Sequence, residues 1–291
     1  MLPFDSTTNY DTFKTATGRA PATWSLWADW GSGSENPSAF PTALVDQLHA
    51  DGTVPMIFWQ PVGAGTTAHP LQTSCGTDYK RIINGGWDDY INTWANAAKA
   101  AGGTILIRFA HEMDGGWFPF GYTRCTNTAT KFKAMWKHVV TIFRKDHASN
   151  VKFVWSPLVA SSKQKSLYPG NSWVDYVGFT AFNWAKSKHR PWLSLSTLVK
   201  RATSGLTKYS NRPWIVAELG SVRQSKENRP AWLKTGYNAV YKAFPRIKVM
   251  VYFNIDMRKR AHDQPNWQLT GTDLKTYKSL LKNAKFQGKV S

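Results

Sequence analysis

The chain has 291 residues, with 37 Lys and Arg against 18 Asp and Glu, a formal net charge of +19 and a hydrophobic content of 42%. This length suits one large α/β domain or two small ones, and the sequence contains no run near the roughly 20 apolar residues of a membrane helix. It has no zinc-finger spacing, no RNA-binding signature and no visible signal peptide after Met1. Because the basic residues are dispersed, we interpret the charge as a solvated basic exterior and expect neither a specific nucleic-acid partner nor a membrane partner.

Eight short apolar runs are predicted to be strands, and most precede a predicted helix. The predicted strands are Met1–Phe4, Thr23–Trp27, Val54–Trp59, Thr104–Phe109, Val151–Trp155, Val174–Thr180, Pro213–Gly220 and Lys248–Asn254. The predicted helices are Asp11–Thr17, Pro41–His49, Trp87–Ala101, Thr130–His147, Ser194–Tyr209, Ala231–Phe244 and Leu274–Ala284.

These strands are apolar on both faces, which is typical of a parallel sheet that helices cover on both sides. We therefore predict an α/β fold with a single (β/α)8 TIM barrel over residues 1–291. A doubly wound open sheet is the alternative fold. The sequence has no GxGxxG motif and no phosphate loop after an early strand, so the barrel is favoured.

Two of the predicted strands lead to a glutamate. The Thr104–Phe109 strand is followed by His111, Glu112 and Trp117, and Glu218 lies near the end of Pro213–Gly220. In a barrel of βα units the chemistry lies at the C-terminal ends of the strands, so we expect both carboxyl groups at one site. A retaining glycosidase uses two carboxyl groups about 5 to 5.5 Å apart, one as acid/base and one as nucleophile. The acid needs a raised pKa, while the nucleophile must stay ionised.

Other side chains near the predicted strand ends fit this chemistry. Arg108 can supply a compensating positive charge for the two glutamates. Four tryptophans at or just after strand ends are candidate sugar platforms, whereas we expect two others, Trp155 and Trp214, to be packing residues. The four candidates are Trp27, Trp59, Trp117 and Trp184.

Other reactions are less well supported. The HE pair at His111 begins a HExxH zinc motif, but Gly115 stands where the second histidine would be, so we expect no metal. No GxSxG motif is present, which argues against a serine hydrolase. A single glutamate at a strand end is often only a structural ion pair. Two of them with aromatic neighbours in a barrel pattern favour catalysis.

The chain has two cysteines, Cys75 and Cys125, and no CxxC motif. Both lie in sequence that resembles loops. If the protein is secreted, a disulfide between neighbouring loops is plausible; two unpaired thiols are the alternative.

Several segments resemble glycoside hydrolase family 26. IRFAHEMDGGWFPFG is similar to that family's acid/base strand, usually RxxHEMNGxWxPWG, and PWIVAELGS to its nucleophile strand. VKFVWSP and DYVGFTAFNW resemble its fifth and sixth strands, and NWQLTGTDLKTYKSLL resembles its closing segment. These segments occur in the family's order over nearly the whole chain.

The resemblance implies a (β/α)8 barrel and a retaining, endo-acting glycanase of the β-mannanase type that acts outside the cell without a cofactor. It implies Glu112 as acid/base and Glu218 as nucleophile, with His111 and Trp117 binding sugar. The chain departs from the family's pattern at four positions where the family usually has Tyr, Asn, Trp and Asn. They are Phe182, Asp114, Phe120 and Leu158.

These departures affect the prediction of the substrate more than the prediction of the reaction type. We expect Phe182 to lie near Glu218, where the family's tyrosine hydroxyl would donate a hydrogen bond that phenylalanine cannot. The leading hypothesis is hydrolysis of β-1,4-mannan by a monomer. A β-1,3-1,4-glucanase or xylanase of the same mechanism is the alternative, and a non-catalytic carbohydrate-binding barrel or a basic nucleic-acid binder is a third hypothesis.

Overall fold

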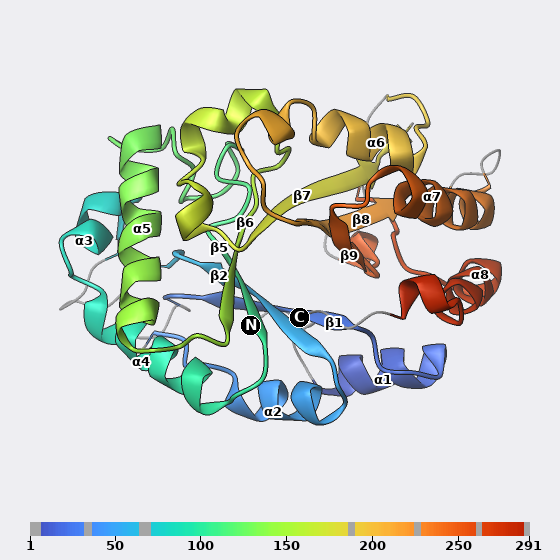
Figure 1. Ribbon diagram of the computed structural model, residues 1–291, viewed down its shortest axis with the longest axis horizontal. Coiled ribbons are helices and arrows are strands. Elements are labelled where there is room, and N and C mark those ends of the chain that lie inside the picture. Colours follow the sequence, from blue (N-terminus) through green and yellow to red (C-terminus); the bar gives the residue numbers. More distant parts are fainter. Residues whose placement is uncertain are drawn as a thin grey trace.

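Seven parallel strands form one curled sheet in the order β1-β2-β5-β6-β7-β8-β9 (Figure 1). The computed structural model describes residues 7–31, 37–63, 71–185, 190–223, 228–259 and 264–287. The strands of this sheet are β1 (Thr23–Asp29), β2 (Val54–Gln60), β5 (Ile105–Phe109), β6 (Val151–Trp155), β7 (Tyr176–Asn183), β8 (Trp214–Ser221) and β9 (Ile247–Tyr252). A two-stranded hairpin outside this sheet consists of β3 (Gln72–Thr73) and β4 (Gly76–Thr77).

Helices surround the curled sheet on its outer side (Figure 1). They are α1 (Thr7–Thr17), α2 (Thr42–Ala50), α3 (Tyr79–Ile83), α4 (Asp88–Ala100), α5 (Ala129–Lys145), α6 (Leu195–Ala202), α7 (Arg229–Ala243) and α8 (Gly271–Leu281). Short 3-10 helices are η1 (Ser162–Leu167), η2 (Asn171–Trp173), η4 (Leu206–Lys208), η5 (Met257–Lys259) and η6 (Ala284–Phe286). Within the described ranges, no helix is both long and apolar enough to cross a membrane.

Seven of the eight predicted strands are confirmed. The eighth, Met1–Phe4, lies outside the described residues. In the described part of the chain β1 and β9 are the edges of the sheet, so the barrel prediction is confirmed only as a curled parallel α/β sheet. The predicted helix Ser194–Tyr209 is divided, because Gly205 adopts a left-handed φ of 77° between α6 and η4. Sequence patterning missed α3 and the β3–β4 hairpin, which are too short to show a period.

The sheet has a different core on each face. Its inner face is lined by small and medium apolar residues together with Phe58, Tyr176 and the partly buried Trp27. Its outer face packs against the helices and contains the large aromatic residues, among them Trp59, Phe109 and Trp155. Side chains alternate between the faces along each strand, so Leu106 and Arg108 point inward while Ile107 and Phe109 point outward.

One irregularity in β8 breaks this alternation. Val216 pairs with Phe179 of β7 and Glu218 pairs with the next residue, Thr180, so Ala217 is an extra residue on β8. The register with β9 shifts across the same stretch of β8. A β-bulge of this kind re-aims the side chains that follow it. In a regular strand of the same sequence, Glu218 would point toward the helices like Val216.

The first prediction concerns a buried ion pair that joins α7 to α8. The Arg229 side chain donates to the Asp273 carboxylate and to the Ser221, Asn266 and Gln268 carbonyls, and both charged side chains are buried. Arg223 contacts the same carboxylate, but its side chain is 54% exposed. We expect Arg229→Met to lower the free energy of unfolding by about 3 to 5 kcal/mol, because it leaves the buried Asp273 carboxylate without its buried counter-charge.

Urea denaturation followed by tryptophan fluorescence measures this loss. The matched control is Arg223→Met, which should cost at most about 1 kcal/mol because its partner is shared and its side chain is exposed. Equal losses in the two variants would contradict the assignment of Arg229 as the main structural partner of Asp273.

Candidate active site

Arg108 and Glu218 form an ion pair on the inner face of the sheet. Arg108 Nη1 donates to Glu218 Oε2 at 2.7 Å, and Arg108 Nε donates to Ser156 Oγ at 2.9 Å. The guanidinium carbon lies 4.4 Å from the ring centroid of Phe58. The Arg108 side chain has no exposed surface and that of Glu218 is 12% exposed, so each gives the other its buried counter-charge.

Glu112 reaches the same site from a turn rather than from a regular strand. The β5 strand stops at Phe109, and Ala110 and Glu112 then adopt left-handed φ angles of 42° and 50°. The Glu112 amide donates to the Ser156 carbonyl at 2.7 Å, which holds this turn against the end of β6. Non-glycine residues in this region store about 1 to 3 kcal/mol of strain each, and such strain is concentrated at functional sites.

The environment of Glu112 favours its protonated form. Burial raises its pKa to about 7, with a further contribution from the negative charge of Glu218 and opposing effects from Arg108 and the Trp117 hydrogen bond. The influence of Glu218 places the two carboxyl groups in one electrostatic site, although they lie 106 residues apart in sequence (218 − 112). A carboxyl group with this pKa can donate a proton near neutral pH and take one back afterwards.

Trp117 combines an exposed ring with a hydrogen bond to Glu112. Its Nε1 donates to Glu112 Oε2 at 3.1 Å, and 55% of the residue is exposed. A Cβ on Gly115 would lie 2.4 Å from the Trp117 ring, so a glycine is required there for the indole to take this position. An exposed indole beside a carboxyl group is suited to stacking on a sugar ring.

His111 lies in the turn between Ala110 and Glu112 and is 3% exposed. Its ring packs edge-on against Phe58 and Phe118, with ring centroids 5.0 and 4.8 Å away. Burial, with the nearby Arg108 charge, lowers its pKa well below the usual value, so the imidazole is neutral. Its Nδ1 has no hydrogen-bond partner within the described residues.

Phe182 and Trp184 belong to an aromatic cluster at the C-terminal ends of β7 to β9. Phe182 contacts Trp184, Phe253 and Trp267, with centroid distances of 5.6, 5.4 and 4.9 Å. Phe182 pairs with Gly220 in the sheet, two residues beyond Glu218. The sequence pattern pointed to Phe182 and Trp184 but missed Phe253 and Trp267, which come from two further segments.

Trp59 corrects one expectation from the sequence. It is fully buried on the outer face of the sheet, with its ring 4.9 Å from Trp94 and 5.7 Å from Phe109. Strand alternation explains the error, since Phe58 takes the inward position next to Arg108 and Trp59 must point to the helices. Trp59 is therefore a core residue and is not available to a sugar.

The other tryptophan predictions fared differently. Trp27 is on the inner face, with its ring 4.4 Å from Phe58. Trp155 and Trp214 are buried, as expected for packing residues.

Trp27 also borders a cavity of about 1560 Å³ that extends from Glu218 past the two edge strands. Glu218 lines that cavity, whereas Glu112 and Trp117 do not.

Sequence reasoning also missed several supporting groups. Ser156 contacts both Arg108 and the Glu112 amide, and its only sequence signal is its position directly after the β6 strand. Asp29 and Gln60 are paired at the ends of β1 and β2, where the Gln60 amide donates to Asp29 at 2.9 Å. Within the described ranges, no group of three or more His, Cys, Asp and Glu is arranged to hold a metal ion.

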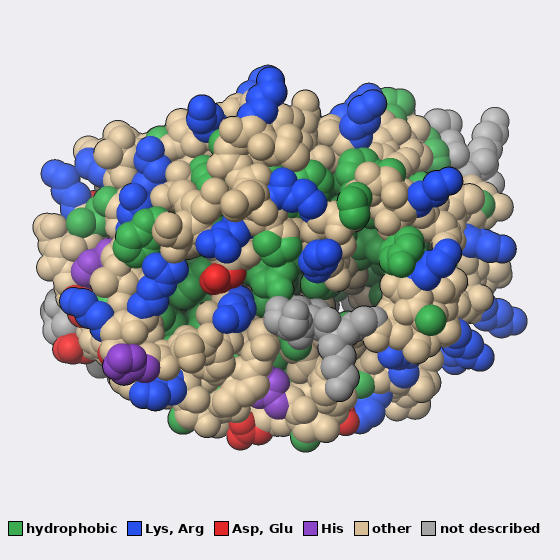
Figure 2. All heavy atoms as spheres, in the orientation of Figure 1, with side chains coloured by type: hydrophobic (Ala, Val, Ile, Leu, Met, Phe, Trp, Pro, Cys, Tyr) green, Lys and Arg blue, Asp and Glu red, His purple; other side chains and the backbone are tan. Residues whose placement is uncertain are grey.

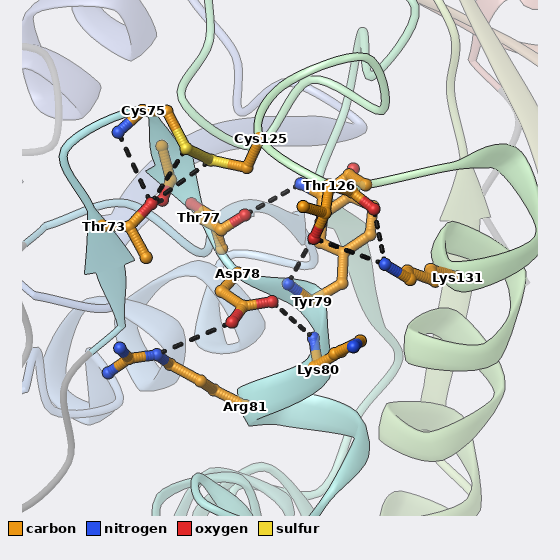
Figure 3. The surroundings of a disulfide bond; sticks show 12 residues. Thr73, Cys75, Thr77, Asp78, Tyr79, Lys80, Arg81, Cys125, Thr126 and Lys131 are labelled. Atoms are coloured by element: carbon orange, nitrogen blue, oxygen red, sulfur yellow. Dashed lines mark hydrogen bonds and ion pairs between the residues drawn. A yellow bond between two sulfur atoms is a disulfide. The ribbon is translucent and has the colours of Figure 1, made fainter.

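The predicted disulfide is present between Cys75 and Cys125, whose Cα atoms are 5.3 Å apart (Figure 3). It joins the β3–β4 hairpin to the loop that follows the Trp117 segment. Thr77 of the hairpin donates its amide to the Pro119 carbonyl at 3.0 Å, and Tyr79 donates its hydroxyl to the Phe120 carbonyl at 2.6 Å. The disulfide therefore supports the loop that contains Trp117.

Basic side chains are scattered over the face of the molecule seen in Figure 2 rather than gathered in one patch. Some of them are used in packing: Lys137 and Arg144 of α5 both lie over the ring of Trp173, 5.6 and 5.1 Å from its centroid. Arg144 also donates to the Ser172 carbonyl. Part of the positive charge therefore has a structural role on the outer layer.

Comparison with known proteins gives a family. The sequence profile of glycosyl hydrolase family 26 matches residues 49–216. Endoglucanase H of Acetivibrio thermocellus is 30% identical over 72% of this chain and 22% of its own length. A mannan endo-1,4-beta-mannosidase of Bifidobacterium adolescentis is 30% identical over 52% of this chain and 16% of its length. The chain thus spans less than a quarter of either relative.

Solved structures with a similar fold include family 26 mannanases. A GH26 beta-mannanase from Bacteroides ovatus aligns with a TM-score of 0.62 and 17% identity over 94% of this chain and 82% of its own. An endo-beta-1,4-mannanase from Cellulomonas fimi aligns with a TM-score of 0.63 and 16% identity over 94% of this chain and 65% of its own. At these identities the structures establish a shared fold alone.

The second prediction concerns the disulfide. We expect a Cys75→Ala, Cys125→Ala double variant to lose about 2 to 4 kcal/mol of unfolding free energy, because the cross-link closes a long loop. Thermal melting with and without a reductant measures this loss. The reductant should lower the melting temperature of the parent protein and leave that of the double variant unchanged. If full reduction left the melting temperature of the parent protein unchanged, the proposed stabilisation by the disulfide would be contradicted.

The third prediction follows from the raised pKa of Glu112. Since the folded state prefers the protonated form, Glu112 costs stability as the pH rises from its usual pKa of 4.5 through about 7. Glutamine mimics the neutral form of the glutamate. The unfolding free energy of Glu112→Gln should therefore equal that of the parent near pH 4 and exceed it at pH 8, by at most about 3 kcal/mol.

Urea denaturation at both pH values tests this difference. The control is Asp89→Asn, which removes an exposed carboxylate on α4 and should behave like the parent at both pH values. If the stability of Glu112→Gln relative to the parent did not change with pH, the interpretation of Glu112 as a destabilised carboxylate would be wrong.

Proposed function

Because the chain belongs to glycosyl hydrolase family 26, we propose that it is a retaining, endo-acting glycoside hydrolase whose substrate is a β-linked polysaccharide, in the first place β-1,4-mannan. The observation that carries the proposal is the unequal environment of the two glutamates. Glu218 is paired with Arg108, whereas burial and the Glu218 charge raise the pKa of Glu112 to about 7. Such a pair matches the division of roles in a retaining glycosidase.

In the first step of the proposed reaction, a Glu218 carboxylate oxygen attacks the anomeric carbon of the sugar. The glycosidic C–O bond breaks while Glu112 gives its proton to the departing oxygen, and a covalent glycosyl ester on Glu218 remains. Arg108 holds the attacking carboxylate through its 2.7 Å hydrogen bond. Trp117 orients Glu112 through Nε1 and offers its exposed ring to the substrate.

In the second step, a water molecule takes the place of the leaving group. Glu112, now ionised, removes a proton from the water as the oxygen attacks the anomeric carbon, and the ester bond to Glu218 breaks. Two inversions at one carbon give net retention. Glu112 ends protonated and Glu218 ends as a carboxylate, so both residues return to their starting states.

The substrate class rests on the relatives. Several curated relatives are named mannan endo-1,4-beta-mannosidases, which favours mannan. The relative that covers most of this chain among those described above is named an endoglucanase, which favours a β-glucan as the second candidate. A xylan is a further candidate of the same mechanism. A non-catalytic carbohydrate-binding barrel is less well supported, because binding alone does not require two carboxyl groups in opposite states.

We also propose the domain organisation, the location and the oligomeric state of the protein. Residues 1–291 form one catalytic (β/α)8 domain. The protein acts outside the cell as a monomer without a cofactor. The disulfide supports this location, since such bonds persist in oxidising compartments.

The fourth prediction tests the function directly. Reducing-sugar release from mannan, mixed-linkage glucan and xylan should be highest on mannan. Glu112→Gln and Glu218→Gln should each reduce turnover on the polymer by at least about 10³-fold. Glu112→Gln should keep the first step on aryl glycosides with good leaving groups, since these need little acid assistance.

Two outcomes would contradict the proposal. Near-normal turnover of both variants on polymer would exclude these glutamates as the catalytic pair. Binding of a glycan by calorimetry without any hydrolysis would instead favour a carbohydrate-binding protein. Asp89→Asn, which removes an exposed carboxylate on α4, serves as the control.

A further inference from the structure

Asp114 lies in the same turn as Glu112 and connects it to the next loop. The Gly115 amide donates to the Glu112 carbonyl at 2.9 Å and closes this turn around Asp114. Asp114 Oδ1 accepts a hydrogen bond from the Leu158 amide at 2.8 Å. Leu158 is in the loop after β6, so the Asp114 side chain ties the Glu112 turn to that loop.

The contact continues from Leu158 toward Glu218. The Leu158 carbonyl accepts from the Thr180 amide at 3.2 Å and from Thr180 Oγ1 at 3.1 Å. Thr180 in turn pairs with Glu218 at the bulge between β7 and β8. A continuous set of hydrogen bonds and strand pairing therefore leads from the turn that holds one glutamate to the strand that holds the other.

Asp114 also affects Glu112 through its charge. The groups acting on the Glu112 carboxyl are Glu218 from β8, Arg108 from β5, Trp117, and Asp114 from its own turn. The Asp114 charge acts in the same direction as burial and Glu218 and raises the pKa of Glu112. Burial raises the pKa of Asp114 too, while its hydrogen bonds with the Leu158 amide and the Gln164 side chain lower it.

We propose that Asp114 is a positioning residue for Glu112: its oxygen anchors the loop after β6, and its negative charge lies in the same turn as the acid/base residue. The proposal rests on the acid/base role given to Glu112 above. An asparagine at this position, the residue usual in the family's motif, could accept the same hydrogen bond from Leu158 but would carry no charge. The chain's aspartate would thus shift proton donation to higher pH.

The fifth prediction separates the two roles with two variants. Asp114→Asn keeps an acceptor oxygen for Leu158 and removes the charge, whereas Asp114→Ala removes both. The probe is the Trp117 indole N–H, which donates to Glu112 and should report its ionisation. Its ¹H–¹⁵N resonance is assigned by its loss in Trp117→Phe, and its chemical shift is followed from pH 4 to 9 without substrate.

We expect Asp114→Asn to move the titration midpoint downward by roughly half a pH unit, because loss of a nearby negative charge favours the ionised glutamate. The alkaline limb of the pH–activity profile should move in the same direction. Asp114→Ala should move the midpoint as well and also lower the melting temperature relative to Asp114→Asn. Asp89→Asn, which removes an exposed carboxylate that is not among the groups acting on Glu112, should leave the midpoint unchanged.

An unchanged midpoint in folded Asp114→Asn would overturn the electrostatic role, and equal melting temperatures for the Asn and Ala variants would overturn the anchoring role. The titration needs no turnover, so it stands apart from the test of the proposed function. If no glycan were hydrolysed, the midpoint shift would still be measurable. If mannan were hydrolysed but the midpoint did not move, only the role of Asp114 would fail.

Discussion

In the candidate active site the buried cation Arg108 has two carboxyl groups for neighbours. This imbalance between one positive charge and two acidic groups determines the character of the site. A fully buried guanidinium costs several kcal/mol unless it is paired. Glu218 supplies that pairing at 2.7 Å, with Ser156 and the face of Phe58 on the other sides of the guanidinium. Among the described residues Glu112 has no ion-pair partner, and burial together with the charge of Glu218 raises its pKa to about 7. The chemical asymmetry of the two glutamates thus follows from the burial of Glu112 and from the pairing of Arg108 with Glu218.

Two departures from regular backbone bring these groups together. The extra residue Ala217 turns Glu218 to the inner face of the sheet, where Arg108 lies. Left-handed φ angles at Ala110 and Glu112 end β5 and lead the chain across the strand end. The left-handed angles cost conformational energy, and the hydrogen bond from the Glu112 amide to the Ser156 carbonyl helps to hold that turn in place. The site therefore depends on a rigid support that lies mostly outside the reacting groups.

Much of this arrangement could be predicted from the sequence, because buried parallel strands read as short apolar runs and glutamates near strand ends stand out. The predicted disulfide between Cys75 and Cys125 is confirmed. Strand alternation was the weak point. Alternation turns Trp59 toward the helices because Phe58 takes the inward position, and it cannot reveal the bulge that turns Glu218 inward. The β3–β4 hairpin and Ser156 were missed because a two-residue strand and a lone serine carry no periodic signal.

The central claim is that Glu218 is the nucleophile and that Arg108 holds it in place. The most direct measurement is mass spectrometry of protein incubated with an activated 2-deoxy-2-fluoro-β-mannoside, which slows breakdown of the covalent intermediate. The account predicts one added sugar per chain, mapped by peptide fragmentation to Glu218, and no labelling of Glu218→Gln. A sugar attached to Glu112 or to any other residue would contradict it.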